Sequence, residues 1–129
     1  MGRPKLPKPT DAELAILRVL WDRGPSTVRQ VMDELNKLRP TGYTTVLKFL
    51  QIMTEKGLVT RDETNRTHVY QPRLSQQRTQ RQVVRDVLNK AFSGSAAELV
   101  GQTLAAGKAS AEELREIRKL LDELERGSK

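Results

Sequence analysis

Residues 43–70 read YTTVLKFLQIMTEKGLVTRDETNRTHVY and combine two hydrophobic periods in one stretch. Apolar residues recur at helical spacing as far as Lys56: Val46, Phe49, Leu50 and Met53. Gly57 then stands where helices commonly end. Residues 58–61 and 67–70 are rich in strand-forming residues and are separated by a polar loop. The stretch therefore predicts a helix followed by a β-hairpin.

Two further helices are predicted before this stretch, each with its own start signal. Thr10 and Glu13 have the spacing of a capping box, and an apolar stripe follows them: Leu14, Leu17, Leu20 and Trp21. The pair Ser26-Thr27 starts the second helix, whose apolar face is Val28, Val31, Met32 and Leu35. Three helices and a hairpin within residues 10–73 predict a winged helix-turn-helix DNA-binding domain. The expected fold class is mostly α with a small β-hairpin.

The predicted third helix, about residues 43–56, carries polar side chains opposite its apolar face. Hydroxyl groups in its first turn and a lysine one turn later can contact phosphates, base edges or a thymine methyl in the major groove. The hairpin loop, at residues 61–67, can reach along the flank as a wing. The candidate DNA contacts are Tyr43, Thr44, Thr45 and Lys48 on the third helix, Arg61 and Arg66 beside the wing, and Arg29 on the second helix. The alternative is that the threonines only cap the helix and that the basic side chains are solvated.

Residues 74–129 predict a helical linker and dimerisation region. A helix over about residues 75–92 is expected to bury Val83, Val84, Val87, Leu88 and Ala91. A short helix over residues 96–104 follows, and Ser110 and Glu113 form a second capping box. The helix behind this box has an apolar seam of Leu114, Ile117, Leu121 and Leu124. The seam needs a partner surface, which is either a second copy of the chain or its own linking helix.

The composition limits the classes of function. The 129 residues contain 23 Lys and Arg against 16 Asp and Glu, a net charge of +7, which favours a polyanionic partner such as nucleic acid. Cysteine is absent, so disulfides and thiolate metal sites are excluded. The single histidine, His68, has no recognisable catalytic or metal-ligating partner and is predicted to be a strand histidine. We therefore expect no enzyme activity, no cofactor and no metal.

The start of the chain is basic. Residues 1–9 contain three prolines and three basic residues, which predicts a basic flexible arm that either touches DNA phosphates or has no role. No apolar run is long enough for a membrane span, and no apolar segment follows the basic start as in a secretory signal. The sequence thus indicates a cytoplasmic chain with no membrane partner.

Five stretches together match a known pattern. They are LAILRVLW at residues 14–21, YTTV at 43–46, EKGLV at 55–59, VYQP at 69–72 and FSGSAAELV at 92–100. In this order and spacing they resemble the penicillinase-repressor family, the BlaI/MecI/CopY group. The resemblance covers residues 9–125 and implies a homodimeric transcriptional repressor that binds palindromic double-stranded operator DNA. It also implies that Thr44, Thr45 and Lys48 lie on the recognition helix and Arg66 in the wing, with Leu99 and Val100 among interlocking dimerisation helices.

The resemblance implies that disrupting the C-terminal helices relieves repression. Family members control β-lactamase, methicillin-resistance or copper-export genes, and in the β-lactam branch a membrane sensor triggers cleavage of an Asn-Phe bond. Gln102-Thr103 stands at that position here, and the cysteine motif of the copper branch is missing. Whether a regulatory protease or a membrane sensor is a partner therefore stays open. The operator sequence, the target genes and the inducing signal stay open as well. A winged-helix adaptor that binds proteins without sequence-specific DNA binding is the alternative function.

Overall fold

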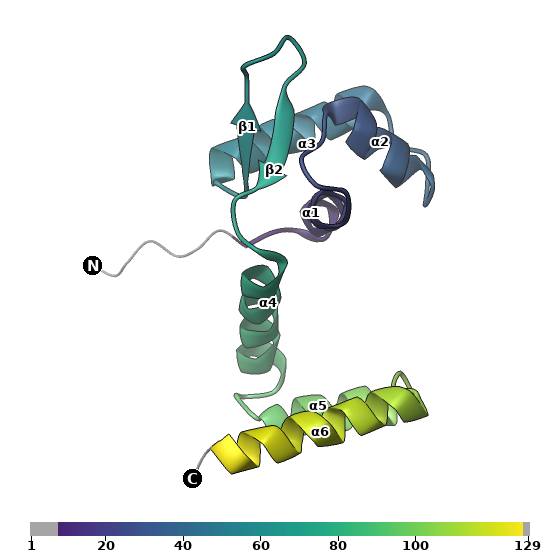
Figure 1. Ribbon diagram of the computed structural model, residues 1–129, viewed down its shortest axis with the longest axis vertical. Coiled ribbons are helices and arrows are strands. Elements are labelled where there is room, and N and C mark those ends of the chain that lie inside the picture. Colours follow the sequence, from purple (N-terminus) through teal and green to yellow (C-terminus); the bar gives the residue numbers. More distant parts are fainter. Residues whose placement is uncertain (1–7, 128–129) are drawn as a thin grey trace, which may run out of the picture. The chain divides into compact units, whose positions relative to one another are not determined.

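The computed structural model describes residues 8–127, which form six helices and one β-hairpin (Figure 1). In chain order the elements are α1 (Asp11–Arg23), α2 (Val28–Asn36), α3 (Tyr43–Lys56), β1 (Val59–Asp62), β2 (Val69–Pro72), α4 (Gln76–Ala91), α5 (Ala96–Ala105) and α6 (Ala111–Gly127). The predicted fold class is confirmed. Of the predicted basic arm, only Lys8 and Pro9 belong to the described residues. The boundary between two compact units falls inside α4, between Val83 and Val84.

The first two helices begin at reciprocal caps. The Glu13 amide donates to the Thr10 hydroxyl at 3.2 Å, and the Thr10 amide donates to the Glu13 carboxylate at 2.9 Å. Thr27 and Gln30 repeat this arrangement at the start of α2. Both starts satisfy backbone donors that a helix leaves free in its first turn. The capping box predicted at Thr10 is confirmed, and Thr27 rather than Ser26 is the cap of α2.

Helix α3 packs one face into the core of the first unit. Val46, Leu50 and Met53 are fully buried, whereas Phe49 is only partly buried at the edge of the core. The helix ends at Gly57, whose φ of 81° is the left-handed conformation that glycine adopts without strain. The buried face fixes which side of α3 points away from the protein.

The hairpin lies further along the chain than predicted. Strands β1 and β2 pair antiparallel, with Asp62 opposite Val69 and Val59 opposite Pro72. Leu58 does not join β1 because its amide donates back to the Met53 carbonyl of α3, at 2.9 Å. Residues 63–68 form the connecting loop, called the wing from here on, so the prediction that His68 lies in a strand is wrong by one position.

The core of the first unit joins all its elements. Its buried apolar residues are Ile16, Leu17, Leu20, Val28, Val31, Val46, Leu50, Met53, Leu58, Val59 and Tyr70. Ser26, also buried, exchanges two backbone hydrogen bonds with Tyr70 and thereby ties the α1–α2 connection to β2. The Trp21 indole donates to the Leu74 carbonyl at 3.2 Å. These links hold the hairpin against the helices.

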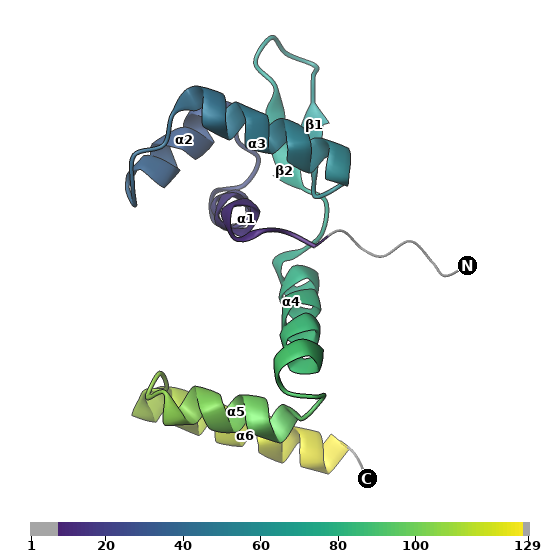
Figure 2. The same ribbon diagram turned by 180° about the vertical axis from the view of Figure 1, so that it is seen from behind.

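The second unit is helical and has little interior. Ser110 and Glu113 form the predicted capping box at the start of α6, and α5 and α6 run side by side in both views (Figures 1 and 2). Neither helix contains a buried residue. The prediction that α4 buries Val84 and Val87 is wrong for the single chain, because nothing covers them and they are 50% and 40% exposed. Among residues 8–127, no helix has the length and hydropathy that a bilayer span requires.

Candidate nucleic-acid interface

The outer face of α3 is polar and accessible. Thr44, Thr45 and Lys48 are all exposed; Thr44 and Lys48 lie opposite the buried face that holds the helix in place, and Thr45 lies to one side of it. Two hydroxyls and an ammonium group thus lie within the first two turns of one rigid element. Such groups can accept and donate hydrogen bonds at base edges and phosphates.

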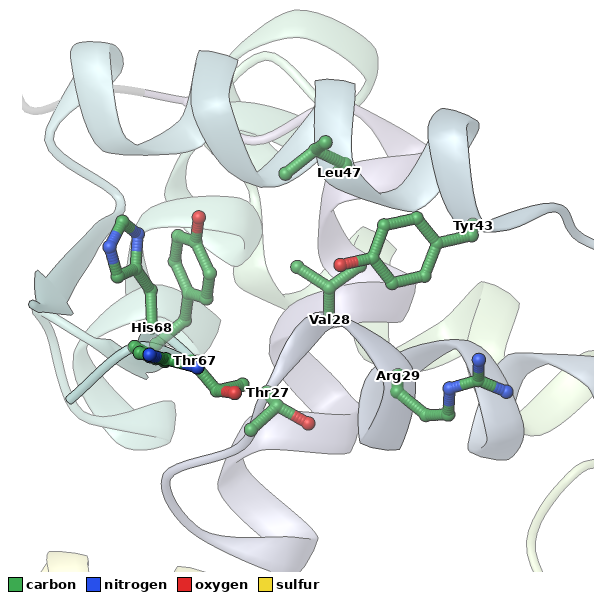
Figure 3. A pocket seen from close by; sticks show the side chains of 9 residues that line it. Thr27, Val28, Arg29, Tyr43, Leu47, Thr67 and His68 are labelled. Carbon is green, nitrogen blue, oxygen red and sulfur yellow. The ribbon is translucent and has the colours of Figure 1, made fainter.

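A hollow of about 440 Å³ lies beside the start of α3, between that helix, the start of α2 and the hairpin (Figure 3). We call it the notch. Its lining residues are Thr27, Val28, Arg29, Tyr43, Leu47, Arg66, Thr67, His68 and Tyr70. It brings together three predicted DNA contacts from three elements, namely Arg29, Tyr43 and Arg66. Figure 3 shows Tyr43 on α3 facing Val28 of α2, with Thr67 and His68 on the hairpin side.

The two arginines beside the wing differ in their surroundings. Arg61 lies in β1 and forms an ion pair with Glu63 at 3.1 Å, and His68 Nε2 lies 3.9 Å from the same carboxylate. Arg66 is exposed within the wing and has no carboxylate partner in the part of the chain that the structure describes. Arg66 therefore offers a free positive charge, whereas that of Arg61 is partly compensated.

Local hydrogen bonds shape the start of the wing. The Thr64 hydroxyl and the Thr64 amide both donate to Asp62 Oδ1. These bonds hold the pKa of Asp62 below its ordinary value of 3.8, so the carboxylate stays charged at neutral pH. The turn fixes how the loop leaves β1, which sequence reasoning had not anticipated.

A partly buried ion pair holds the other end of α3. Lys56 Nζ donates to Glu13 Oε1 at 2.7 Å, and the Glu13 side chain is only 3% exposed. Burial raises the pKa of Glu13, but the hydrogen bond from Lys56 and the Thr10 amide outweigh it and leave the pKa below 4.5. The sequence indicated a capping role for Glu13, and nothing in it connected Glu13 with a lysine 43 positions away.

The predicted dimerisation residues form an uncovered apolar surface in the second unit. Leu99 and Ile117 are half-buried, whereas four others are exposed: Val100, Leu114, Leu121 and Leu124. Leu104 of α5 and Leu120 of α6 are also exposed, and neither was predicted from the sequence: Leu120 falls outside the 3, 4, 3 spacing of α6, and Leu104 lies in the other helix. The alternative in which the chain's own linking helix covers the α6 seam leaves Leu124 unexplained, since it is 70% exposed.

Metal-binding groupings are not found among the described residues. Within residues 8–127, no three His, Cys, Asp or Glu side chains lie close enough together to hold a metal ion. His68 instead lies in the wall of the notch, beside basic and aromatic side chains.

Known proteins are similar to this chain in sequence and fold. Residues 9–123 match the model of the penicillinase repressor family. The chain is 26% identical over 119 residues to the penicillinase repressor of Bacillus licheniformis, covering 92% of this chain and 93% of that protein. It is 42% identical over 69 residues to the transcriptional regulator BlaI of Mycobacterium tuberculosis, covering 53% of this chain and 50% of that regulator. A solved DNA-binding domain of the repressor BlaI matches with a TM-score of 0.50 and 27% identity, over 57% of this chain and 90% of that one.

Proposed function

The chain belongs to the penicillinase repressor family, whose members are transcriptional repressors and not enzymes, and from this premise we propose that it represses by binding palindromic operator DNA as a homodimer. The observation that carries the proposal is the exposed face of α3, where Thr44, Thr45 and Lys48 project from a helix that is fixed by its buried side. Its target is DNA, so its place of action is the cytoplasm.

Helix α3 reads the major groove in this proposal. An α-helix fits this groove, and each base pair presents a distinct pattern of donors and acceptors there. Lys48 donates to guanine acceptors or to a phosphate, and the hydroxyls of Thr44 and Thr45 contact a phosphate, a base edge or a thymine methyl. The three side chains lie on one surface, so they can engage neighbouring base pairs at the same time.

The notch and the wing hold the DNA backbone. Tyr43 donates its hydroxyl to a phosphate, and Arg29 and Arg66 supply positive charge from two other elements around the same hollow. Arg61 contributes less because Glu63 is already its partner. Contacts of this kind fix the register of the helix on the duplex but carry no base information.

The second copy covers the apolar surface of α5 and α6. Burying one leucine side chain contributes about 1.5–3 kcal/mol, so a surface built on Leu114, Ile117, Leu121 and Leu124 gains substantially from a partner. Pairing also links two α3 helices, and the second half-site is then bound at a high effective concentration. Any event that separates the C-terminal helices therefore lifts repression.

Footprinting on the DNA upstream of the protein's own gene tests this proposal. We expect protection of two half-sites related by a dyad and separated by about 10–10.5 base pairs or a multiple of that spacing. Protection should weaken steeply as salt rises, because phosphate contacts release counterions. A chain that protects no DNA under low salt contradicts the proposal and favours the protein-interaction adaptor.

A further inference from the structure

His68 lies in the wall of the notch and has no part in the DNA contacts proposed above. We propose that His68 is a further DNA-binding residue, which in its protonated form donates a hydrogen bond to the operator phosphate held in the notch. This role rests on the proposed DNA-binding function and adds one residue to the backbone contacts of Tyr43, Arg29 and Arg66. Its consequence is that protons promote operator binding.

The hairpin holds His68 at a defined place beside the notch. His68 is the last residue of the wing and directly precedes β2. Two residues later, Tyr70 is 1% exposed and exchanges two backbone hydrogen bonds with Ser26, so this side of the wing is anchored to the helices. Figure 3 shows the His68 ring on the hairpin side of the hollow. The imidazole is therefore kept beside any phosphate that enters the notch.

The ring nitrogens of His68 are available to a ligand. The side chain is 40% exposed, and no hydrogen bond to the ring is found within residues 8–127. Glu63 Oε1 lies 3.9 Å from Nε2, which is beyond hydrogen-bonding distance. A protonated imidazole has two N–H donors, so it can direct one of them at a phosphate oxygen.

Charged groups from several elements surround the His68 ring. They and the tyrosines of the same wall are Arg29 of α2, Tyr43 of α3, Arg66 of the wing, Tyr70 of β2, and the Arg61–Glu63 pair at the start of the wing. Without DNA, the arginines disfavour a further positive charge, and the Glu63 carboxylate favours it. A phosphate in the notch adds an anion and shifts this balance toward the protonated ring. Because coupling between two binding events is reciprocal, protonation of His68 then strengthens DNA binding by the same factor.

A purely structural role of His68 would depend on Glu63 instead of DNA. In that role the protonated ring pairs with the carboxylate, and acid changes the wing without any phosphate. The geometry disfavours it, because Arg61 already holds the carboxylate at 3.1 Å, closer than His68. Removal of the carboxylate separates the two roles, since a phosphate contact survives this change and a pair with Glu63 does not.

The experiment measures the operator affinity of the full-length chain between pH 5.5 and pH 8, at constant salt, by fluorescence anisotropy. Histidine ordinarily changes its charge within this range, and His68 is the only histidine of the chain. The Glu13–Lys56 pair keeps its charges there, because the pKa of Glu13 lies below 4.5. The test variant is His68→Gln, which stays polar but takes up no proton. The matched variant is Glu63→Gln, which removes the facing carboxylate.

We expect the wild type to bind the operator about tenfold or more tightly at pH 5.5 than at pH 8, the order of one hydrogen bond to a charged group. His68→Gln should lose this rise in acid, and Glu63→Gln should keep it. A wild type whose affinity does not change with pH overturns the role of His68 while operator binding stands. A rise that persists in His68→Gln, or that disappears in Glu63→Gln, overturns it as well. A wild type that does not bind the operator at any pH overturns the proposed function itself.

Discussion

At the scale of single residues, Glu13 shows how one side chain serves two purposes. It closes the capping box of α1 through the Thr10 amide, and it also accepts a hydrogen bond from Lys56 at the end of α3. A buried carboxylate is costly unless charged or polar groups satisfy it. The pair thus links the first helix of the domain to the proposed recognition helix.

Replacing Glu13 with glutamine isolates the charge, because glutamine retains the capping-box geometry. We expect Glu13→Gln to lower the free energy of unfolding at neutral pH by about 1–3 kcal/mol, since Lys56 loses its anionic partner. Urea denaturation measures this change. The control is Glu113→Gln, which alters the same position of the exposed capping box of α6 and should cost far less.

The difference in the free energy of unfolding between the wild type and Glu13→Gln should shrink as the pH falls. The folded-state pKa of Glu13 lies below its ordinary value of 4.5, so the charged form stabilises the folded protein at pH values above 4.5. This contribution declines below pH 4.5 and is lost once the pH has fallen through the folded-state pKa. Wild type and Glu13→Gln should therefore converge in stability in acid, and a gap that persists there contradicts the ion-pair explanation.

Arg66 and Arg61 provide an internal comparison at the wing. We expect Arg66→Ala to weaken operator binding and to reduce the slope of log affinity against log salt by about 1, as for a lost phosphate contact. Arg61→Ala should change both quantities less, because Glu63 already neutralises part of its charge. Fluorescence anisotropy titrations at several salt concentrations measure both. Equal effects of the two substitutions would show that the Glu63 pair does not matter for DNA binding.

At the scale of elements, hydrophobic spacing and caps predicted the helices well. Thr10, Ser110 and Gly57 marked helix ends that the structure confirms, because these are local effects of the backbone. The hairpin was misplaced because Leu58 has the composition of a strand residue but is hydrogen-bonded to α3. Such competition between neighbouring elements depends on the tertiary structure and cannot be read from β-propensity.

The sequence predicted the part of the site that depends on local periodicity, and not the part that depends on tertiary contacts. The exposed positions Thr44, Thr45 and Lys48 followed from the period of α3, which also set its buried face. The notch was not predicted, because it forms between three elements that are distant in sequence. Long-range pairings such as Glu13 with Lys56 leave no periodic signal in one sequence.

Gly57, at the end of α3, has a backbone conformation that favours glycine. Its φ is +81°, and a Cβ there would lie 2.9 Å from a guanidinium nitrogen of Arg73. We expect Gly57→Ala to destabilise the domain by about 1–2 kcal/mol through the left-handed conformation alone. Thermal unfolding measures the effect. The control Gly101→Ala, inside α5 with open space around the added methyl group, should be neutral or stabilising, and an equal loss in both variants would contradict the argument.

At the scale of the whole molecule, the two units differ in how their apolar residues are covered. The first unit buries a connected core, whereas α5 and α6 leave large apolar side chains exposed in the single chain. Exposed apolar side chains that gather on neighbouring helices favour an interaction site. Sequence reasoning expected Val84 and Val87 to be buried, and a second copy of the chain would supply the cover that the single chain lacks.

Leu121→Asp tests that role. A carboxylate placed on the α6 seam should prevent pairing, so sedimentation should give a monomer and operator affinity should fall by about 100-fold or more. Binding to an isolated half-site should stay unchanged. The control Lys119→Met also lowers the net charge by one, but it lies on the opposite side of α6 and should remain dimeric. A dimeric Leu121→Asp variant would show that another surface holds the two copies together.

The most direct test of DNA reading by α3 is the affinity of Lys48→Met for the footprinted operator, beside wild type and Lys119→Met. Both substitutions lower the net charge of the chain by one, but only Lys48 lies on the proposed recognition face of α3. We predict that Lys48→Met loses about 5- to 150-fold in operator affinity, the value of one good base-edge contact, and keeps its fold and its dimer. Lys119→Met should bind like the wild type. Wild-type operator affinity in Lys48→Met would contradict the account.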